Sequence, residues 1–300
     1  MTNLSVEQMV ADVMRTNAII QEIRGKFPEV PFPDIRKETA MYLDLEGNLQ
    51  RSRYNMVIGN LDGEDLVYGA TSEAYKVVPH ELMVAKVMDS IPEVEGWGKP
   101  VFRPVLYKEG SRFRFQADFP DCEWKFKTTK GREVPVSPRL TFQNSYDQFL
   151  KFRIEFGGQE QVCKNGMVAF KIQHTVSKRH IDSLDIDAQM EKIGVGIQAY
   201  AEQKGIWEAW ARTEIPAPVV EEILIAMPFG KKHKDELLQL PQIGTQETLA
   251  SWMTSGSVNA FDLHGMFTQF LTHQVESEMV KVEKMEKVEK TFHQMFAKMN

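Results

Sequence analysis

Three short segments of the chain alternate basic and aromatic residues: Arg112-Phe113-Arg114-Phe115, Lys125-Phe126-Lys127 and Lys151-Phe152-Arg153. Successive side chains of a β-strand point to opposite faces, so each segment predicts a strand with phenylalanine on one face and positive charge on the other. Lysine and arginine neutralise phosphates and so bind a nucleic acid of any sequence. The candidate nucleic-acid-binding residues are Arg112, Arg114, Lys125, Lys127, Lys151 and Arg153. A half-buried antiparallel sheet whose charges only meet water fits the same pattern, and this alternative stays open.

The charge of the chain is unevenly distributed. The net charge of −6 argues against a general polyanion binder. However, the segment from Lys99 to His180 holds 16 basic and 8 acidic residues, which leaves 20 basic and 34 acidic residues elsewhere. A positive module inside an acidic chain is typical of a surface that faces an anion.

Motifs for catalysis are weak. The sequence has no glycine-rich phosphate loop, no nucleophile elbow, no HExxH and no CxxC. Asp182, Asp185 and Asp187 have the chemistry to hold Mg²⁺, but acids at the start of a helix more often complement its dipole. Cys163 is expected to be a small packed residue rather than a nucleophile. The sequence therefore favours a protein that is not an enzyme, with no metal site and no cofactor.

The order of elements predicts an α+β fold. A central antiparallel or mixed sheet is expected between an N-terminal helical arm and a C-terminal helical region. Capping and apolar spacing predict helices over residues 5–26, 80–90 and 181–212, and Asp62-Gly63 predicts a hairpin turn. The expected division of the chain is 1–33 for the helix and its proline-rich connector, 34–180 for the strand-rich basic core, and 181–300 for the helical region.

The last helical region carries an apolar stripe at spacings of three and four residues: Val282, Met285, Val288, Phe292, Met295 and Met299. A stripe of this kind on a solvated helix predicts self-association through residues 275–299. We therefore expect a homo-oligomer.

Composition places the chain in a reducing compartment. Two cysteines in 34.5 kDa cannot build a disulfide framework. No apolar run approaches the length of a membrane span, and the N-terminus lacks the pattern of a signal peptide. The expectation is a cytoplasmic protein without a membrane partner.

Two motifs resemble a known family. They are Asn144-Ser145-Tyr146-Asp147 and Gln161-Val162-Cys163-Lys164-Asn165-Gly166-Met167, the second followed by His174-Thr175. With these motifs the chain resembles the phage/plasmid-like protein family, domain of unknown function 932. The family pattern has His where this chain has Tyr146, and Lys-Val-Val-x-Asn where this chain reads Lys76-Val77-Val78-Pro79-His80. The shared constellation is Asn144, Asp147, Cys163, Asn165, Gly166 and His174.

The resemblance implies a product of phages, plasmids or other mobile elements, with no settled activity. Together with the basic strands, it favours a non-enzymatic, DNA-associated protein, a single-strand binder or an annealing oligomer in the host cytoplasm. One alternative is a protein-binding inhibitor of a host defence complex, because acidic surfaces can imitate nucleic acid. Another is a metal-dependent nuclease that uses the aspartates.

Overall fold

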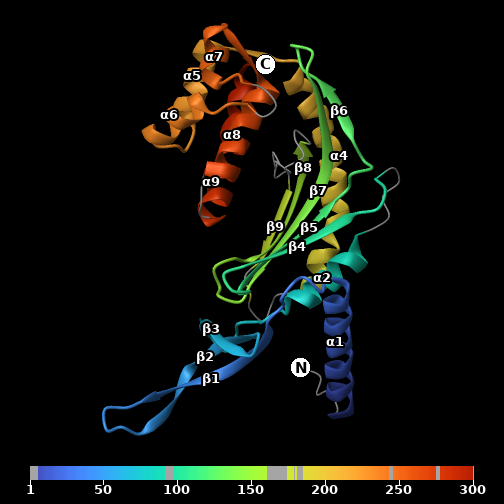
Figure 1. The fold of residues 1–300 in the computed structure, drawn as a ribbon, viewed down its shortest axis with the longest axis vertical. Coiled ribbons are helices and arrows are strands. Elements are labelled where there is room, and N and C mark those ends of the chain that lie inside the picture. Colours follow the sequence, from blue (N-terminus) through green and yellow to red (C-terminus); the bar gives the residue numbers. More distant parts are fainter. Residues whose placement is uncertain are drawn as a thin grey trace.

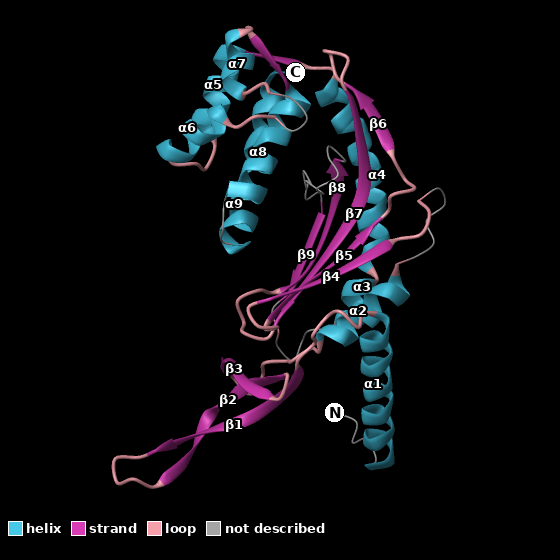
Figure 2. Ribbon diagram, viewed as in Figure 1, coloured by secondary structure: helices cyan, strands magenta, loops and turns pink. Residues whose placement is uncertain are grey.

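The computed structural model describes residues 6–91, 97–160, 174–178, 180, 185–242, 246–274 and 278–299. Its helices and antiparallel sheets form an α+β fold, which confirms the predicted class. A helix and a small sheet project from one end of a larger sheet, and a helical region occupies the other end (Figures 1 and 2).

The N-terminal part contains one helix and a three-stranded sheet. Helix α1 (Val6–Lys26) confirms the predicted N-terminal helix. Strands β1 (Asp34–Leu43), β2 (Leu49–Leu61) and β3 (Glu64–Thr71) pair antiparallel in the order β1-β2-β3. Asp62 and Gly63 have φ of 53° and 87° between β2 and β3, so the predicted hairpin turn is confirmed.

The central part is a six-stranded sheet preceded by helix α2 (His80–Ser90), which matches its predicted bounds. The order is β4-β5-β7-β8-β9, and β6 also pairs with β7. Every pairing is antiparallel. The strands are β4 (Val101–Tyr107), β5 (Arg112–Asp118), β6 (Trp124–Lys127), β7 (Glu133–Ser145), β8 (Phe152–Glu160) and β9 (His174–Lys178).

The C-terminal part is helical apart from a short two-stranded sheet. The sequence predicted one helix over residues 181–212, whereas the described part of this segment forms two helices. Glu191 is the C-cap of the first and the N-cap of the second. The elements are α3 (Ile186–Met190), α4 (Lys192–Ala211), β10 (Glu214–Pro216), α5 (Ala217–Ala226), α6 (Lys231–Gln239), α7 (Leu249–Thr254), β11 (Ser257–Asn259), α8 (Ala260–Gln274) and α9 (Glu278–Met299). None of the helices, over the residues described, is long and apolar enough to cross a bilayer.

One large core joins the apolar face of the six-stranded sheet to the helices. The Phe115 ring on β5 meets the Phe27 ring, just after α1, at a centroid distance of 6.0 Å. At the other end of the sheet, the Phe126 ring on β6 lies 6.3 Å from the Trp207 ring on α4. Helix α4 therefore covers the face on which the phenylalanines lie (Figure 1).

The apolar stripe of α9 packs inside its own chain. Val288 and Phe292 are buried, and the Phe292 ring lies 4.8 Å from the Trp210 ring and 6.5 Å from the Phe267 ring. The sequence predicted that this stripe meets a second copy. From Val288 to Met295 it is already covered inside its own chain, by α4 and α8 among others, because an amphipathic pattern specifies burial but not the partner.

Candidate nucleic-acid interface

Strand β5 separates its aromatic and basic side chains as the sequence predicts. Phe113 and Phe115 are fully buried, whereas Arg112 and Arg114 are only partly buried on the opposite face. The alternation follows from the period of two along a strand. The face that carries the arginines is called the polar face of the six-stranded sheet below.

The strand register brings basic residues from three strands to the polar face. Arg114 lies opposite Gln143 of β7, and Gln143 lies opposite Arg153 of β8. On β6, Lys127 lies opposite Glu133 of β7. Glu133 and Gln143 are separated by an even number of residues, so their side chains point to the same face of β7. Lys125 shares the face of Lys127, whereas Lys151 is exposed just before β8. Five of the six candidate residues thus share one sheet face.

Carboxylates pair with several of these cations. Arg112 Nε lies 2.7 Å from Asp147, and Arg153 Nε lies 2.8 Å from Glu155. Lys125 lies 3.4 Å from Glu123 and 3.6 Å from Glu133. The polar face is therefore less positive than its number of basic residues suggests, because neighbouring acids and the more distant Asp147 pair with these bases.

A deeper ion pair lies on the same face. Arg139 of β7 donates to Asp118 of β5 at 2.7 Å, and both side chains are buried. Asp118 also lies 3.2 Å from Arg103, which is more than half exposed on the edge strand β4. Breaking such a pair leaves a buried charge uncompensated, so this pair holds β4, β5 and β7 in register.

Basic and aromatic side chains gather where β4–β5 and β7–β8 turn. The Arg112 guanidinium lies 3.5 Å from the centroid of the Phe149 ring, and that ring is 38% exposed. The Arg114 guanidinium lies 5.3 Å from the Tyr107 ring. We call Tyr107, Arg112, Arg114, Phe149 and Lys151 the basic–aromatic corner. Sequence reasoning missed Tyr107 and Phe149, which stand at strand ends outside the alternating segments.

Two of the segments that resemble the family pattern, 76–80 and 144–147, meet behind this corner. Asn144 Nδ2 donates to the carbonyl of Val78 at 2.8 Å and lies 2.9 Å from His80 Nδ1. The backbone N–H of His80 donates to the Tyr146 hydroxyl at 2.8 Å, and the two rings stack at 4.0 Å. The motif therefore joins α2 to β7.

The histidines of this junction are not proton-transfer groups at neutral pH. Burial lowers the pKa of His80 to about 3 and that of His180, packed on Tyr75, to about 4. Burial also raises the pKa of the Tyr146 hydroxyl well above its usual range. All three side chains stay neutral near pH 7, which suits a structural role.

The other motif residues contribute less to the site. Asp147 accepts the backbone N–H of Phe149 at 3.0 Å in addition to its ion pair with Arg112, so it shapes the corner. Cys163, Asn165 and Gly166 lie outside the described residues. His174 is the first residue of β9 and lies opposite Phe156.

The aspartates have local roles wherever they are described. Asp185 caps α3 by accepting the backbone N–H of Ala188 at 3.1 Å, and Asp187 pairs with Lys86 of α2. Asp182 lies outside the described residues. Within the described part of the chain, no group of three His, Cys, Asp or Glu residues has a geometry for a metal ion.

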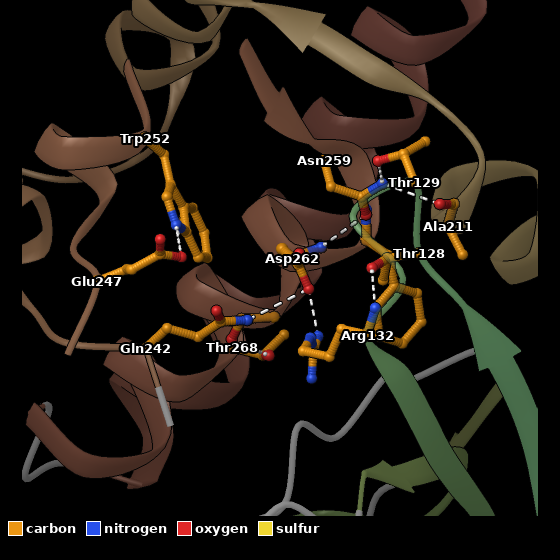
Figure 3. A network of polar contacts seen from close by, with 12 residues as sticks. Thr128, Thr129, Arg132, Ala211, Gln242, Glu247, Trp252, Asn259, Asp262 and Thr268 are labelled. Carbon is orange, nitrogen blue, oxygen red and sulfur yellow. Dashed lines mark hydrogen bonds and ion pairs between the residues drawn. The ribbon is translucent and has the colours of Figure 1, made fainter. Parts of the chain in front are cut away.

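A second polar network fixes the far end of the sheet (Figure 3). Arg132, after the β6–β7 turn, pairs with Asp262 in the first turn of α8, and Gln242 donates to the same carboxylate at 3.2 Å. Asn259 Nδ2 donates to Thr129 Oγ1 at 3.1 Å and to the Ala211 carbonyl at 2.9 Å. The network links the β6–β7 hairpin to α4 and α8, and its contacts hold these three elements together.

Fold and site together define an α+β protein built on a six-stranded antiparallel sheet, with a motif that joins sheet and helix. The chain belongs to the family described as "Domain of unknown function (DUF932)", whose model matches residues 67–298. The match begins within β3, so α1, β1 and β2 precede it. No curated protein and no solved structure matches the chain.

Proposed function

We propose that this chain is a non-enzymatic protein of a phage or other mobile element that binds single-stranded DNA in the host cytoplasm. The observation that carries the proposal is the basic–aromatic corner, where Arg112 stacks on the exposed Phe149 and Arg114 lies over Tyr107. Proteins that bind single strands combine cations along the backbone with aromatic rings on which bases stack.

The corner favours a single strand over a duplex. Phe149 and Tyr107 offer ring faces that a paired base, stacked within a helix, cannot reach. Lys127 on β6 and Lys151 before β8 are exposed and add charge along the polar face. Between the corner and β6, the basic residue of β7 on this face is Arg139, which is buried against Asp118, so the exposed cations lie at the two ends of this path.

Asp147 limits the binding that the corner can offer. Its carboxylate lies 2.7 Å from Arg112 Nε, so a phosphate competes with it for that guanidinium. We therefore assign phosphate contacts mainly to Arg114, Lys127 and Lys151, and we assign to Arg112 the orientation of Phe149.

Binding of fluorescent oligo(dT) by the full chain, measured by anisotropy between about 50 and 200 mM salt, tests the proposal. The test variant is Arg114→Gln with Lys151→Gln. The control variant is Lys26→Gln with Arg36→Gln, which removes two partly or fully exposed charges from α1 and β1. Each lost phosphate contact on a single strand lowers the slope of log affinity against log salt concentration by about 0.7. We therefore expect this slope to be shallower by about 1.4 in the test variant and unchanged in the control variant.

Two outcomes contradict the proposal. One is the absence of oligo(dT) binding by the parent at low salt. The other is an equal loss in test and control variants, which indicates attraction by overall charge. The first result favours the alternative of a protein partner in a host defence complex, for which the acidic remainder of the chain provides the surface, and the second means that the corner is not the binding site.

A further inference from the structure

Large apolar side chains are exposed mainly in the N-terminal quarter of the chain. The described part of the chain exposes fifteen of them, and ten lie on α1 or on β1 to β3 and their turns. These ten are Val10, Val13, Met14, Met41, Tyr42, Leu43, Leu45, Leu49, Tyr54 and Val67. Single exposed apolar residues are normal, but a concentration of this kind is typical of an interaction surface.

Within the part of the chain that the structure describes, helix α1 is anchored at its C-terminal end. Ile23 is buried, and Arg24 pairs with the buried Glu81 of α2 at 2.8 Å. By contrast, every residue from Val10 to Arg15 is exposed. Val10, Val13 and Met14 stand at the i, i+3, i+4 spacing of one helix face, so this half of α1 presents an apolar stripe that no described residue of the chain covers.

The β1–β2 hairpin is the second exposed element, and we call its outer part, residues 41–51, the ribbon. Leu43 and Leu49 lie directly opposite each other and are both about two-thirds exposed. The turn is ordered by Asp44, whose side chain accepts the backbone N–H of Asn48 at 2.8 Å. A two-stranded hairpin is only marginally stable in water, so this ribbon gains stability from any surface that covers it.

The charges of the ribbon disfavour a polyanion as its partner. Within residues 41–51, Asp44 and Glu46 stand at the turn and Arg51 is the single base, so the acids outnumber the bases. Helix α1 likewise carries both Asp12 and Arg15 in its exposed half. Two mixed-charge surfaces with apolar centres suit each other better than either suits DNA.

The positions of the two elements indicate what covers them. Helix α1 and the ribbon project from the same end of the molecule on opposite sides (Figure 1). The parts that meet are of similar length, since the three paired residues on each ribbon strand span about 10 Å and the six exposed residues from Val10 to Arg15 span about 9 Å. A second copy placed alongside brings its ribbon against the α1 stripe of the first.

We propose that this chain assembles head to tail, with the β1–β2 ribbon of one copy packed on the exposed half of α1 in the next. The contact uses different surfaces of the two copies, so it repeats and gives a ring or a filament. It lies in the segment that precedes the DUF932 match, and it replaces α9 as the site of self-association.

Light scattering on the full chain, coupled to size exclusion, tests the assembly with two variants. In the helix variant, Val10→Glu with Met14→Lys removes the stripe and creates a favourable i,i+4 ion pair. In the ribbon variant, Leu43→Lys with Leu49→Glu places opposite charges across the strand pair, which keeps the hairpin. Ile225→Glu on α5, where Ile225 is 75% exposed, is the control.

The parent and the control are expected to have masses above that of a dimer, and each variant alone to be a monomer. An equimolar mixture of the two variants restores one contact, since one supplies an intact ribbon and the other an intact helix. The mixture is therefore expected to form a heterodimer of twice the monomer mass. A monomeric parent, an unchanged mass in either variant, or a mixture that stays monomeric overturns the proposal.

Discussion

The backbone N–H of His80 donates to the hydroxyl of Tyr146 at 2.8 Å, and the two rings lie 4.0 Å apart. His80 is the first residue of α2, where a helix leaves its N–H groups without partners. The Tyr146 hydroxyl therefore takes the place of an N-cap side chain, because Pro79 at the N-cap position has none to offer.

Removing the Tyr146 hydroxyl is expected to destabilise the fold. Tyr146→Phe keeps the ring on His80 but leaves the buried N–H unpaired, at a cost of about 1–3 kcal/mol in the free energy of unfolding. Urea unfolding measures the change. Tyr54→Phe is the matched control, since its ring is exposed on β2 and its loss is expected to be near zero. Equal stabilities of Tyr146→Phe and the parent would show that the hydroxyl does not cap α2.

Stability is expected to fall on acidification below about pH 6.5, the pKa of histidine in an unfolded chain. Burial lowers the folded-state pKa of His80 to about 3 and that of His180 to about 4. Below pH 6.5 the unfolded chain therefore binds protons that the folded chain does not. The two histidines together remove about 5 kcal/mol of stability between about pH 6.5 and 4.5.

The buried carboxyl of Glu81 acts in the opposite direction. Burial raises its folded-state pKa in spite of the nearby Arg24, so its contribution favours the folded state at low pH and is lost as the pH rises above its unfolded value. The contribution of His80 is isolated by measuring the free energy of unfolding against pH in His80→Asn. In this variant we expect the loss of stability on acidification to be roughly half of that in the parent. An unchanged slope would mean that His80 is protonated in the folded state.

The Arg132–Asp262 pair is expected to hold the helical region against the sheet. Asp262 is buried, so Arg132→Leu leaves a carboxylate without its cation and costs about 3–5 kcal/mol. Arg132→Leu with Asp262→Leu removes both charges and is expected to cost less than the single change. The exposed pair Lys26–Glu22 is the control, and Lys26→Leu is expected to cost under about 0.5 kcal/mol. A double variant less stable than the single one would contradict this account.

The sequence predicts best the features whose cause is local. The alternation of β5 and the Asp62-Gly63 turn follow from the side chains of a few adjacent residues, and both are confirmed. Strand β1 was not predicted, because most of its residues are exposed on both faces and leave no alternating pattern.

Features that depend on tertiary contacts were beyond the sequence. Asp147 neutralises Arg112 across 35 residues, a pairing that only the β7–β8 loop creates. The stripe of α9 was visible, but its cover by Trp210 and Phe267 was not. Five of the six basic residues thus lie on one face of a sheet as the alternation predicts, whereas their charge balance required the structure.

The charge balance at the corner predicts that one substitution raises the affinity for DNA. A gain of affinity is a sharper test than a loss, because a misfolded variant cannot mimic it. Asp147→Asn removes the carboxylate that competes with phosphate for Arg112, while an amide oxygen can still accept the N–H of Phe149. The loop is therefore expected to keep its shape. One more phosphate contact makes the log–log salt slope on oligo(dT) steeper by about 0.7, and affinity rises most at low salt.

The control for this gain is Asp44→Asn in the β1–β2 turn. It removes the same charge at a site far from the corner, where the amide oxygen can still accept the N–H of Asn48 and the bond from the Gln50 side chain is lost. We expect its oligo(dT) affinity and salt slope to match the parent. If Asp147→Asn binds no more tightly than the parent, the guanidinium of Arg112 does not contact phosphate even when it is released. If both variants gain equally, net charge governs binding and the corner is not the site.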